Sequence, residues 1–229
     1  MPIVLPSFDL AGTWALEVVV SSTSRAPILG EVRSASRSRL LVHVTPNGDV
    51  WTQRQELCTS SIDGGSKLAK VILPRGWVKA MPPRTYTVTV TPGRNGWVYA
   101  ADSGVQTVGY DDTRGPMPTR GADPQVIDSD GDGRPGATVL VRVPAFGTGE
   151  IYLAHRGHSR LEGRVVNANR IEGRVVMLEM TQVTLGASRK VFDFSPVTRP
   201  DPARSTFAMW RVDGDAGCDA TLATPASPG

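Results

Sequence analysis

The sequence predicts an all-β protein: an antiparallel up-and-down barrel of about ten strands, with a two-sheet β-sandwich as the alternative. Short runs rich in β-branched and aromatic residues recur along the chain, separated by Gly, Pro and Asn turns. No segment shows the 3.6-residue apolar repeat of an amphipathic helix. We expect the sheet to close, because closure removes the exposed edges that so many short strands would otherwise leave.

The 229-residue chain is long enough for one large β domain, and we assign residues 1–222 to it. The residues 223–229, rich in Pro, Ala and Ser, are expected to form a disordered tail. The net charge of +3 is small and the arginines are scattered, which argues against nucleic-acid binding. No apolar run approaches the ~20 residues of a membrane span.

In the first half of the chain, the clearest feature is a hairpin around the turn Pro46-Asn47-Gly48-Asp49, since Asn-Gly is a favoured tight-turn pair. Residues 12–20 predict the first strand. Residues 21–38, rich in Ser, are expected to be a long connection that holds a short strand at 28–32. The other expected strands of this half are 40–45, 50–57, 67–73, 84–91 and 97–100.

In the second half, residues 111–136 lack any periodicity and predict a long functional loop before a strand at 137–143. An internal repeat then places Leu-Glu-Gly-Arg-Val-Val at 161–166 and Ile-Glu-Gly-Arg-Val-Val at 171–176. Pairing in which residue numbers sum to 336 matches apolar residues on one face and opposite charges on the other. It favours a five-residue loop, 166–170. The final strands are expected at 181–185 and 205–212.

One stretch points to a specific chemistry. Asp128, Asp130 and Asp132 alternate with small residues and are followed by Gly133, so three carboxylates converge on one point. Their mutual repulsion is relieved if a hard cation such as Ca²⁺ accepts their oxygens. We expect these residues, with the carbonyl of Arg134, to be ligands of Ca²⁺. An acidic, solvated turn without an ion is the alternative.

The calcium shell would need a further ligand. In an EF-hand a bidentate Glu stands at loop position twelve, but here that position is Val139 in a predicted strand, which excludes an EF-hand. The nearest carboxylates in sequence are those of Asp111, Asp112, Asp123 and Glu150. Because the closing Glu is absent, we expect weak binding, with a Kd on the order of 10⁻⁴ to 10⁻³ M.

The two cysteines, Cys58 and Cys218, predict a disulfide that ties the end of the chain to its body, although two free thiols would also fit the composition. A weak calcium site functions where calcium is millimolar, outside the cytoplasm. We therefore expect an extracytoplasmic protein that is secreted, periplasmic or lipid-anchored. The N-terminal residues do not form a signal peptide, so an export signal is expected to be missing from this chain.

Other candidate residues give weaker signals. His155 and His158 flank Arg156-Gly157, and we interpret them as exposed turn residues rather than a metal pair or, with Ser159, a hydrolase site. His43 lies in a strand without an evident partner. The five tryptophans either fill the core or line a ligand cavity, and core packing is the default.

Three resemblances extend this interpretation. The pair Gly12 and Trp14 on the first strand resembles the lipocalin (calycin) signature, which implies that an arginine near the end of the barrel, Arg211, packs over the tryptophan. The Asp-rich loop resembles those of EF-hands, dockerins and thrombospondin type 3 repeats. The overall layout is similar to uncharacterised secreted or lipoprotein β-barrel domains of myxobacterial type, which implies location but not activity.

The sequence therefore predicts a non-catalytic extracytoplasmic β-barrel module with a calcium-stabilised loop, whose lumen takes a small apolar ligand or is filled by side chains. The alternative is a secreted hydrolase or isomerase with acidic residues at the mouth of the barrel. An empty, apolar lumen would favour ligand binding, whereas a pocket of converging Asp, Glu and His would favour the enzyme. The sequence does not predict the oligomeric state.

Overall fold

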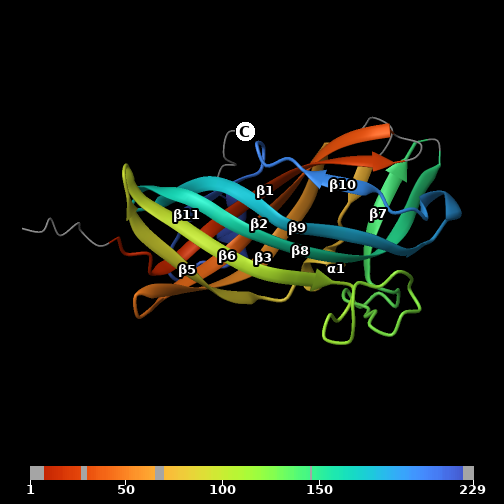
Figure 1. Cartoon of the computed structure of the whole chain (residues 1–229), viewed down its shortest axis with the longest axis horizontal. Coiled ribbons are helices and arrows are strands. Elements are labelled where there is room, and N and C mark those ends of the chain that lie inside the picture. Colours follow the sequence, from red (N-terminus) through yellow and green to blue (C-terminus); the bar gives the residue numbers. More distant parts are fainter. Residues whose placement is uncertain (1–7, 27–29, 65–69, 145, 224–229) are drawn as a thin grey trace, which may run out of the picture.

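The protein is built mainly of β-strands, as Figure 1 shows. The structure, a computed structural model, describes residues 8–26, 30–64, 70–144 and 146–223. Within these ranges eleven strands form one antiparallel sheet that curls around on itself. The prediction of an all-β, barrel-like fold is confirmed.

Eight of the described strands form a ring in which each strand pairs with two neighbours. They follow one another in chain order, and the last pairs with the first, so the ring is an up-and-down barrel. The ring strands are β1 (Gly12–Ala26), β2 (Gly30–Asn47), β3 (Val50–Gly64), β5 (Arg84–Gly93), β6 (Gly96–Val108), β8 (Gly147–Asn167), β9 (Arg170–Ala187) and β11 (Thr206–Arg211).

The ring closes over only part of its length. The pairing of β3 with β5 ends at Gln55 and Arg84, and beyond it the sheet continues from β8 through β7 to β4. A further strand, β10, pairs with the far end of β1. The remaining elements are β4 (Lys70–Ile72), β7 (Ala137–Val143), β10 (Val197–Pro200), the helices α1 (Arg75–Lys79) and α2 (Cys218–Ala223), and the 3₁₀ turn η1 (Lys190–Phe192).

The main hydrophobic core occupies the interior of the ring. Trp14 belongs to this core and is fully buried, and its indole N–H donates to the carbonyl of Leu10 at 3.0 Å. The guanidinium of Arg211 lies 4.3 Å from the Trp14 ring centroid, the contact that the lipocalin resemblance implied. A second cluster, around Ile151 and Phe192, fills the other end of the sheet, where η1 and α1 pack. Each such buried side chain stabilises the fold by about 1.5–3 kcal/mol.

The serine-rich segment 21–38 corrects the prediction of a long connection. β1 continues to Ala26 and β2 starts at Gly30, and β1 pairs with β2 along its whole length. The hydroxyls of Ser22 and Ser34 face each other across this pair at 3.4 Å. Cross-strand hydroxyl contacts of this kind satisfy the polar groups, so serine is tolerated where the alternation of apolar residues has stopped. The expected separate strand at 28–32 falls partly outside the described residues, at 27–29.

Both predicted hairpins are present. Asn47 pairs with Val50 around the first turn, and Gly48 adopts a positive φ of 60°. In the second, Leu161 pairs with Val175 and Glu162 with Arg174, so the residue numbers sum to 336 as predicted. The loop is tighter than the expected 166–170, because a bulge after Val165 lets the strands continue to a two-residue turn.

The chain end is fixed to the outside of the ring by the predicted disulfide, Cys58–Cys218, whose Cα atoms are 5.3 Å apart. It holds α2 near the buried carboxylate of Glu17, which pairs with Arg37 at 2.6 Å and with Arg39 at 3.2 Å. Arg39 also donates to the Thr221 carbonyl of α2 at 3.0 Å. Of the expected tail, residues 224–229 lie outside the described residues.

Candidate metal centre

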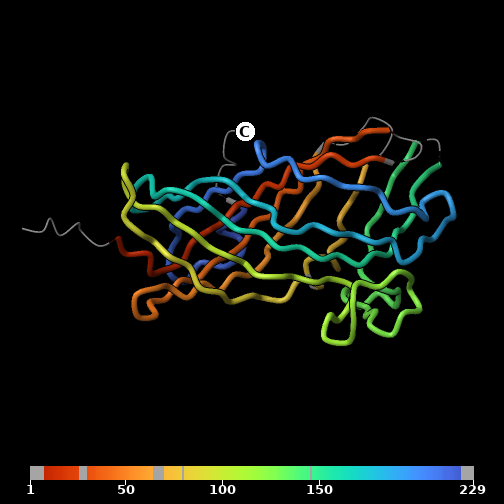
Figure 2. The backbone as a smooth tube through the Cα atoms, in the orientation of Figure 1, coloured from red at the N-terminus to blue at the C-terminus, as the bar shows by residue number. Residues whose placement is uncertain are grey.

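The predicted loop lies between β6 and β7, and residues 109–136 form a compact protrusion near one end of the molecule (Figure 2). It packs on the outer face of the barrel through Tyr110, which contacts Tyr152 and Leu185 in a small buried cluster. Gly109 and Gly136 pass so close to the Leu153 carbonyl that a Cβ atom on either would collide with it. The base of the loop is therefore fixed on β8.

The loop brings the three predicted aspartates together. One carboxylate oxygen from each of Asp128, Asp130 and Asp132 lies within 4.8 Å of the others. Gly131 and Gly133 adopt φ angles of 73° and 81°, a region that favours glycine, and this turns the chain between the aspartates. The predicted glycine turn and the convergence of the carboxylates are both observed.

Asp128 organises the turn itself. Its carboxylate accepts backbone N–H groups from Gly131 at 2.8 Å, Asp132 at 3.2 Å and Gly133 at 2.8 Å. Desolvation alone would raise the pKa of Asp128, but the three N–H donors outweigh it, and the pKa lies below its ordinary value. Asp128 is therefore held in its charged form.

Asp132 and Asp130 connect the loop to the start of β7 through Thr138. Asp132 Oδ2 accepts the Thr138 hydroxyl at 2.6 Å, and Asp130 Oδ2 accepts the Thr138 N–H at 2.9 Å. Gly76 of α1 stands so close that a Cβ on it would lie 3.1 Å from the Asp130 Cβ. This approach shields one side of Asp130 from water.

The other oxygen of Asp130, Oδ1, is buried and has no hydrogen-bond partner. Desolvation, followed by the nearby charge of Asp132, raises the pKa of Asp130 above its ordinary value. A buried carboxylate oxygen without a donor is unfavourable unless a proton or a cation satisfies it. This atom distinguishes the cluster from an ordinary acidic turn.

The further carboxylates considered from the sequence are engaged elsewhere. Asp123 accepts the Thr119 N–H at 2.8 Å, Asp111 pairs with Arg114 at 2.9 Å, and Asp112 pairs with Arg156 at 3.2 Å. Glu150 accepts the Tyr152 hydroxyl at 2.8 Å. Among the described residues, none of these four belongs to the acidic cluster.

Arg134 has two observed contacts. Its backbone N–H donates to Asp132 Oδ1 at 2.8 Å, and its guanidinium lies 5.6 Å from the Tyr152 ring centroid. The use of its carbonyl as a ligand stays a prediction. The donors in the cluster are all carboxylate oxygens, which suit a hard cation better than a thiolate- or imidazole-seeking metal. The cluster could thus hold a metal ion.

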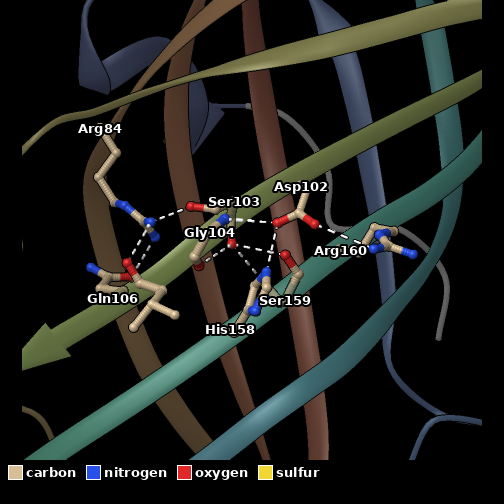
Figure 3. Close-up of polar contacts among 9 residues, drawn as sticks. Arg84, Asp102, Ser103, Gly104, Gln106, His158, Ser159 and Arg160 are labelled. Atoms are coloured by element: carbon tan, nitrogen blue, oxygen red, sulfur yellow. Dashed lines mark hydrogen bonds and ion pairs between the residues drawn. The ribbon is translucent and has the colours of Figure 1, made fainter.

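The histidines differ from their prediction as exposed turn residues, because both belong to β8. Burial lowers the pKa of His155. His158 Nε2 lies 2.6 Å from Asp102 Oδ1, on the outer face of the barrel (Figure 3). The Ser103 hydroxyl contacts that of Ser159, 3.2 Å away, and no hydrogen bond joins either serine to His158 among the described contacts. His43 Nδ1, expected to lack a partner, lies 3.2 Å from the Thr13 hydroxyl.

Sequence reasoning missed the polar network that Figure 3 shows around Asp102, Ser103 and Gly104. β6 extends well beyond the predicted 97–100 and carries a bulge between Asp102 and Val105. Gly104 turns the chain there with a φ of 63°, and Asp102 accepts its N–H at 2.9 Å. The Asp-Ser-Gly triplet was the available signal, since an Asp followed by Gly marks a turn or bulge.

The outer face also carries a groove of about 1060 Å³. Its floor includes the backbone of the paired Gly163 and Gly173 of the internal repeat. Above them lie two exposed ion pairs, of which Arg174–Glu162 is the shorter at 2.7 Å. The repeat therefore shapes a charged surface as well as a strand register.

Fold and site together define an antiparallel β-barrel protein with an acidic loop on its outer face. No protein-family model, no curated protein and no solved structure gives a significant match to this chain. Within the described residues, no helix is long and apolar enough to cross a membrane.

Proposed function

We propose that this protein is a non-catalytic extracytoplasmic β-barrel module whose loop, residues 109–136, is ordered by a calcium ion. The observation that carries the proposal is the buried, unpartnered Oδ1 of Asp130 beside the carboxylates of Asp128 and Asp132. A divalent cation would satisfy that oxygen and would offset the repulsion among the three charges.

Calcium fits the irregular geometry of this loop better than magnesium. Ca²⁺ accepts six to eight oxygen ligands in flexible arrangements, whereas Mg²⁺ demands near-ideal octahedral geometry. Three carboxylates supply part of such a shell, and the Arg134 carbonyl and water would supply more. Because no fourth carboxylate joins the cluster among the described residues, we expect a Kd on the order of 10⁻⁴ to 10⁻³ M.

The disulfide supports an extracytoplasmic location, whether secreted, periplasmic or lipid-anchored. Cys58–Cys218 closes a loop of 160 residues, and such bonds persist mainly in oxidising compartments. A calcium site of millimolar affinity is also filled only where calcium is abundant. The disulfide and the proposed calcium site therefore both favour an extracytoplasmic location.

A calorimetric titration tests the calcium site. We expect calcium to release or absorb heat on binding to the native protein, and Asp130→Asn to weaken binding by at least about tenfold, since it removes the charge of the shielded carboxylate. Asp49→Asn is the matched control, because it removes an exposed carboxylate from the Gly48-Asp49 turn. No binding at millimolar calcium, or equal binding by Asp130→Asn, would show that the loop is an ordinary acidic turn.

The secreted hydrolase or isomerase considered from the sequence has weaker support. Asp102 and His158 are joined at 2.6 Å, but the two nearby serine hydroxyls bond to each other. A small apolar ligand in the lumen stays a prediction as well. At the ring's main core, Trp14 and Tyr99 are fully buried, and Tyr99 packs against Phe207 with ring centroids 5.8 Å apart.

A further inference from the structure

Arg84 occupies an unusual place inside the barrel. It is the first residue of β5 and pairs with Gln55 at the last rung between β5 and β3. Tyr86, two residues later on the same face of β5, packs against the main core, so Arg84 also faces inward. Its guanidinium reaches across to the bulge of β6, as Figure 3 shows.

The guanidinium of Arg84 donates only to neutral groups. Its acceptors are the Gln106 side-chain oxygen at 3.2 Å, the Val105 carbonyl at 3.1 Å and the Ser103 carbonyl. An arginine has five N–H donors, so three bonds leave two without an acceptor among the described residues. The bonds hold the bulge in place, but they supply no counter-charge.

No carboxylate lies within ion-pair distance of Arg84 in the described part of the chain, whereas Arg37, Arg156 and Arg174 each pair with an acid. Desolvation lowers the pKa of Arg84, and the one titratable group that acts on it is Tyr86. A half-buried cation without a partner is unfavourable, and a bound anion would remove that cost.

A chain of hydrogen bonds orients the side chain of Gln55, the residue opposite Arg84 in the register. The Tyr99 hydroxyl donates to Gln53 Oε1 at 2.7 Å, and Gln53 Nε2 donates to the Tyr86 hydroxyl at 2.8 Å. The Tyr86 hydroxyl in turn donates to Gln55 Oε1 at 2.7 Å. Burial raises the pKa of Tyr86 to about 12, so its hydroxyl stays protonated and can donate.

This chain fixes the orientation of the Gln55 carboxamide. Its oxygen is occupied by Tyr86, so its NH₂ group points elsewhere, and it has no acceptor among the described contacts. Gln55 and Arg84 are neighbours on the inner face, being opposite each other in the register. The register therefore places two residues that retain free donors next to each other, and neither has an acidic partner among the described contacts.

We propose that Arg84 and Gln55 bind an oxyanion, a carboxylate or a phosphate group, on the inner face of the barrel. The positive charge of the Arg84 guanidinium would attract such a group, and its remaining N–H donors and the Gln55 amide would donate to the oxygens. The site does not depend on calcium, because it lies on strands β3 and β5 rather than in the acidic loop. The bound group is either a free anion or part of a larger ligand.

Thermal unfolding of the native protein tests the site. Sodium phosphate should raise the melting temperature in a saturable way, beyond the effect of sodium chloride at equal ionic strength. Calcium is omitted, because its phosphate precipitates. A parallel series with acetate tells whether a carboxylate alone is enough or whether the phosphate group is preferred. A melting temperature that responds to these anions no differently from chloride overturns the proposal.

Gln55→Glu locates the site. The new carboxylate can still accept the Tyr86 hydroxyl and pairs with Arg84, so the variant should fold and melt higher in plain buffer. Phosphate affinity should fall by at least about tenfold, because the internal carboxylate now occupies the guanidinium and repels the anion. Thr85→Glu is the matched control, since it adds the same charge to the exposed face of β5. If phosphate stabilises Gln55→Glu as strongly as the native protein, the anion is bound adventitiously elsewhere and the proposal fails.

Discussion

At the scale of single residues, Asp128 and Asp130 are carboxylates in two different environments. Asp130 has a buried oxygen without a donor, whereas Asp128 has three backbone donors for one carboxylate. The two pKa values accordingly lie on opposite sides of the ordinary value. Chemically identical side chains two positions apart thus acquire different roles: one builds the turn and the other needs a ligand.

Asp102 should give the protein a measurable dependence on acid. Hydrogen bonding to His158, then to the Gly104 N–H, lowers the pKa of Asp102 from 3.8 to about 2. A depressed folded-state pKa stabilises the fold above the unfolded value, and this stabilisation is lost as pH falls from about 4 to about 2. We expect Asp102→Asn to have a lower free energy of unfolding than the native protein at neutral pH. This difference in stability should become smaller as the pH falls from about 4 to about 2.

Because the Asp102 side chain is 45% exposed, the gap at neutral pH should be small, about 1 kcal/mol or less. Unfolding curves at several pH values measure it, with Asp49→Asn as a control that leaves the His158 pair intact. A gap that stayed constant down to pH 2 would show that the Asp102–His158 contact is not formed in solution.

At the scale of elements, the β8–β9 hairpin has the most strongly determined register. Its two glycines, Gly163 and Gly173, are opposite each other in the register. A Cβ on Gly173 would collide with the carbonyl of Glu162 and with the Cα of Gly163. Close backbone approach at this rung therefore requires glycine in both strands.

Gly173→Ala should lower the free energy of unfolding by about 1–3 kcal/mol, the usual effect of forcing extra atoms into a packed site. Chemical denaturation measures it. Gly214→Ala is the matched control, because no atom lies within 4 Å of the position that its Cβ would take. Equal stability of the two variants would mean that the paired strands are farther apart than described.

Some strands and site residues could be predicted from the sequence, and others could not. The register of β8 and β9 was predictable because apolar matching and charge matching both select the same alignment. The extension of β1 and β2 through residues 21–38 was not, because inward-facing serines remove the contrast between the two faces of a strand. The three aspartates of the candidate metal site were predicted, but the shielding of Asp130 by Gly76 depends on a contact with α1, far away in sequence.

The proposed anion site at Arg84 and Gln55 could not be predicted from the sequence. Arg84 and Gln55 lie on strands whose pairing follows from the ring, and the bulge that Arg84 reaches is set by Gly104 on a third strand. Sequence patterns identify single strands and adjacent hairpins. The contacts of Arg84 involve β3, β5 and β6, so they depend on the pairing of three strands in the folded sheet.

At the scale of the whole molecule, the disulfide joins the chain end to β3. Replacing Cys58 and Cys218 together by serine should lower the free energy of unfolding by up to about 4–5 kcal/mol, because the unfolded chain regains the freedom of a long loop. Denaturation of this variant, compared with the native protein under reducing conditions, measures the effect. The variant and the reduced native protein should have the same free energy of unfolding. Stability equal to that of the oxidised protein would mean that the bond does not form.

Hydrogen exchange along the chain tests whether calcium orders the loop between β6 and β7. Calcium at millimolar concentration should slow exchange at the loop N–H groups, above all those of Gly131, Gly133 and Thr138, which donate to the three-aspartate cluster. Exchange in the β1–β2 pair should not change, and magnesium at equal ionic strength should have a smaller effect. Exchange in residues 109–136 that is the same with and without calcium would show that calcium does not order this loop.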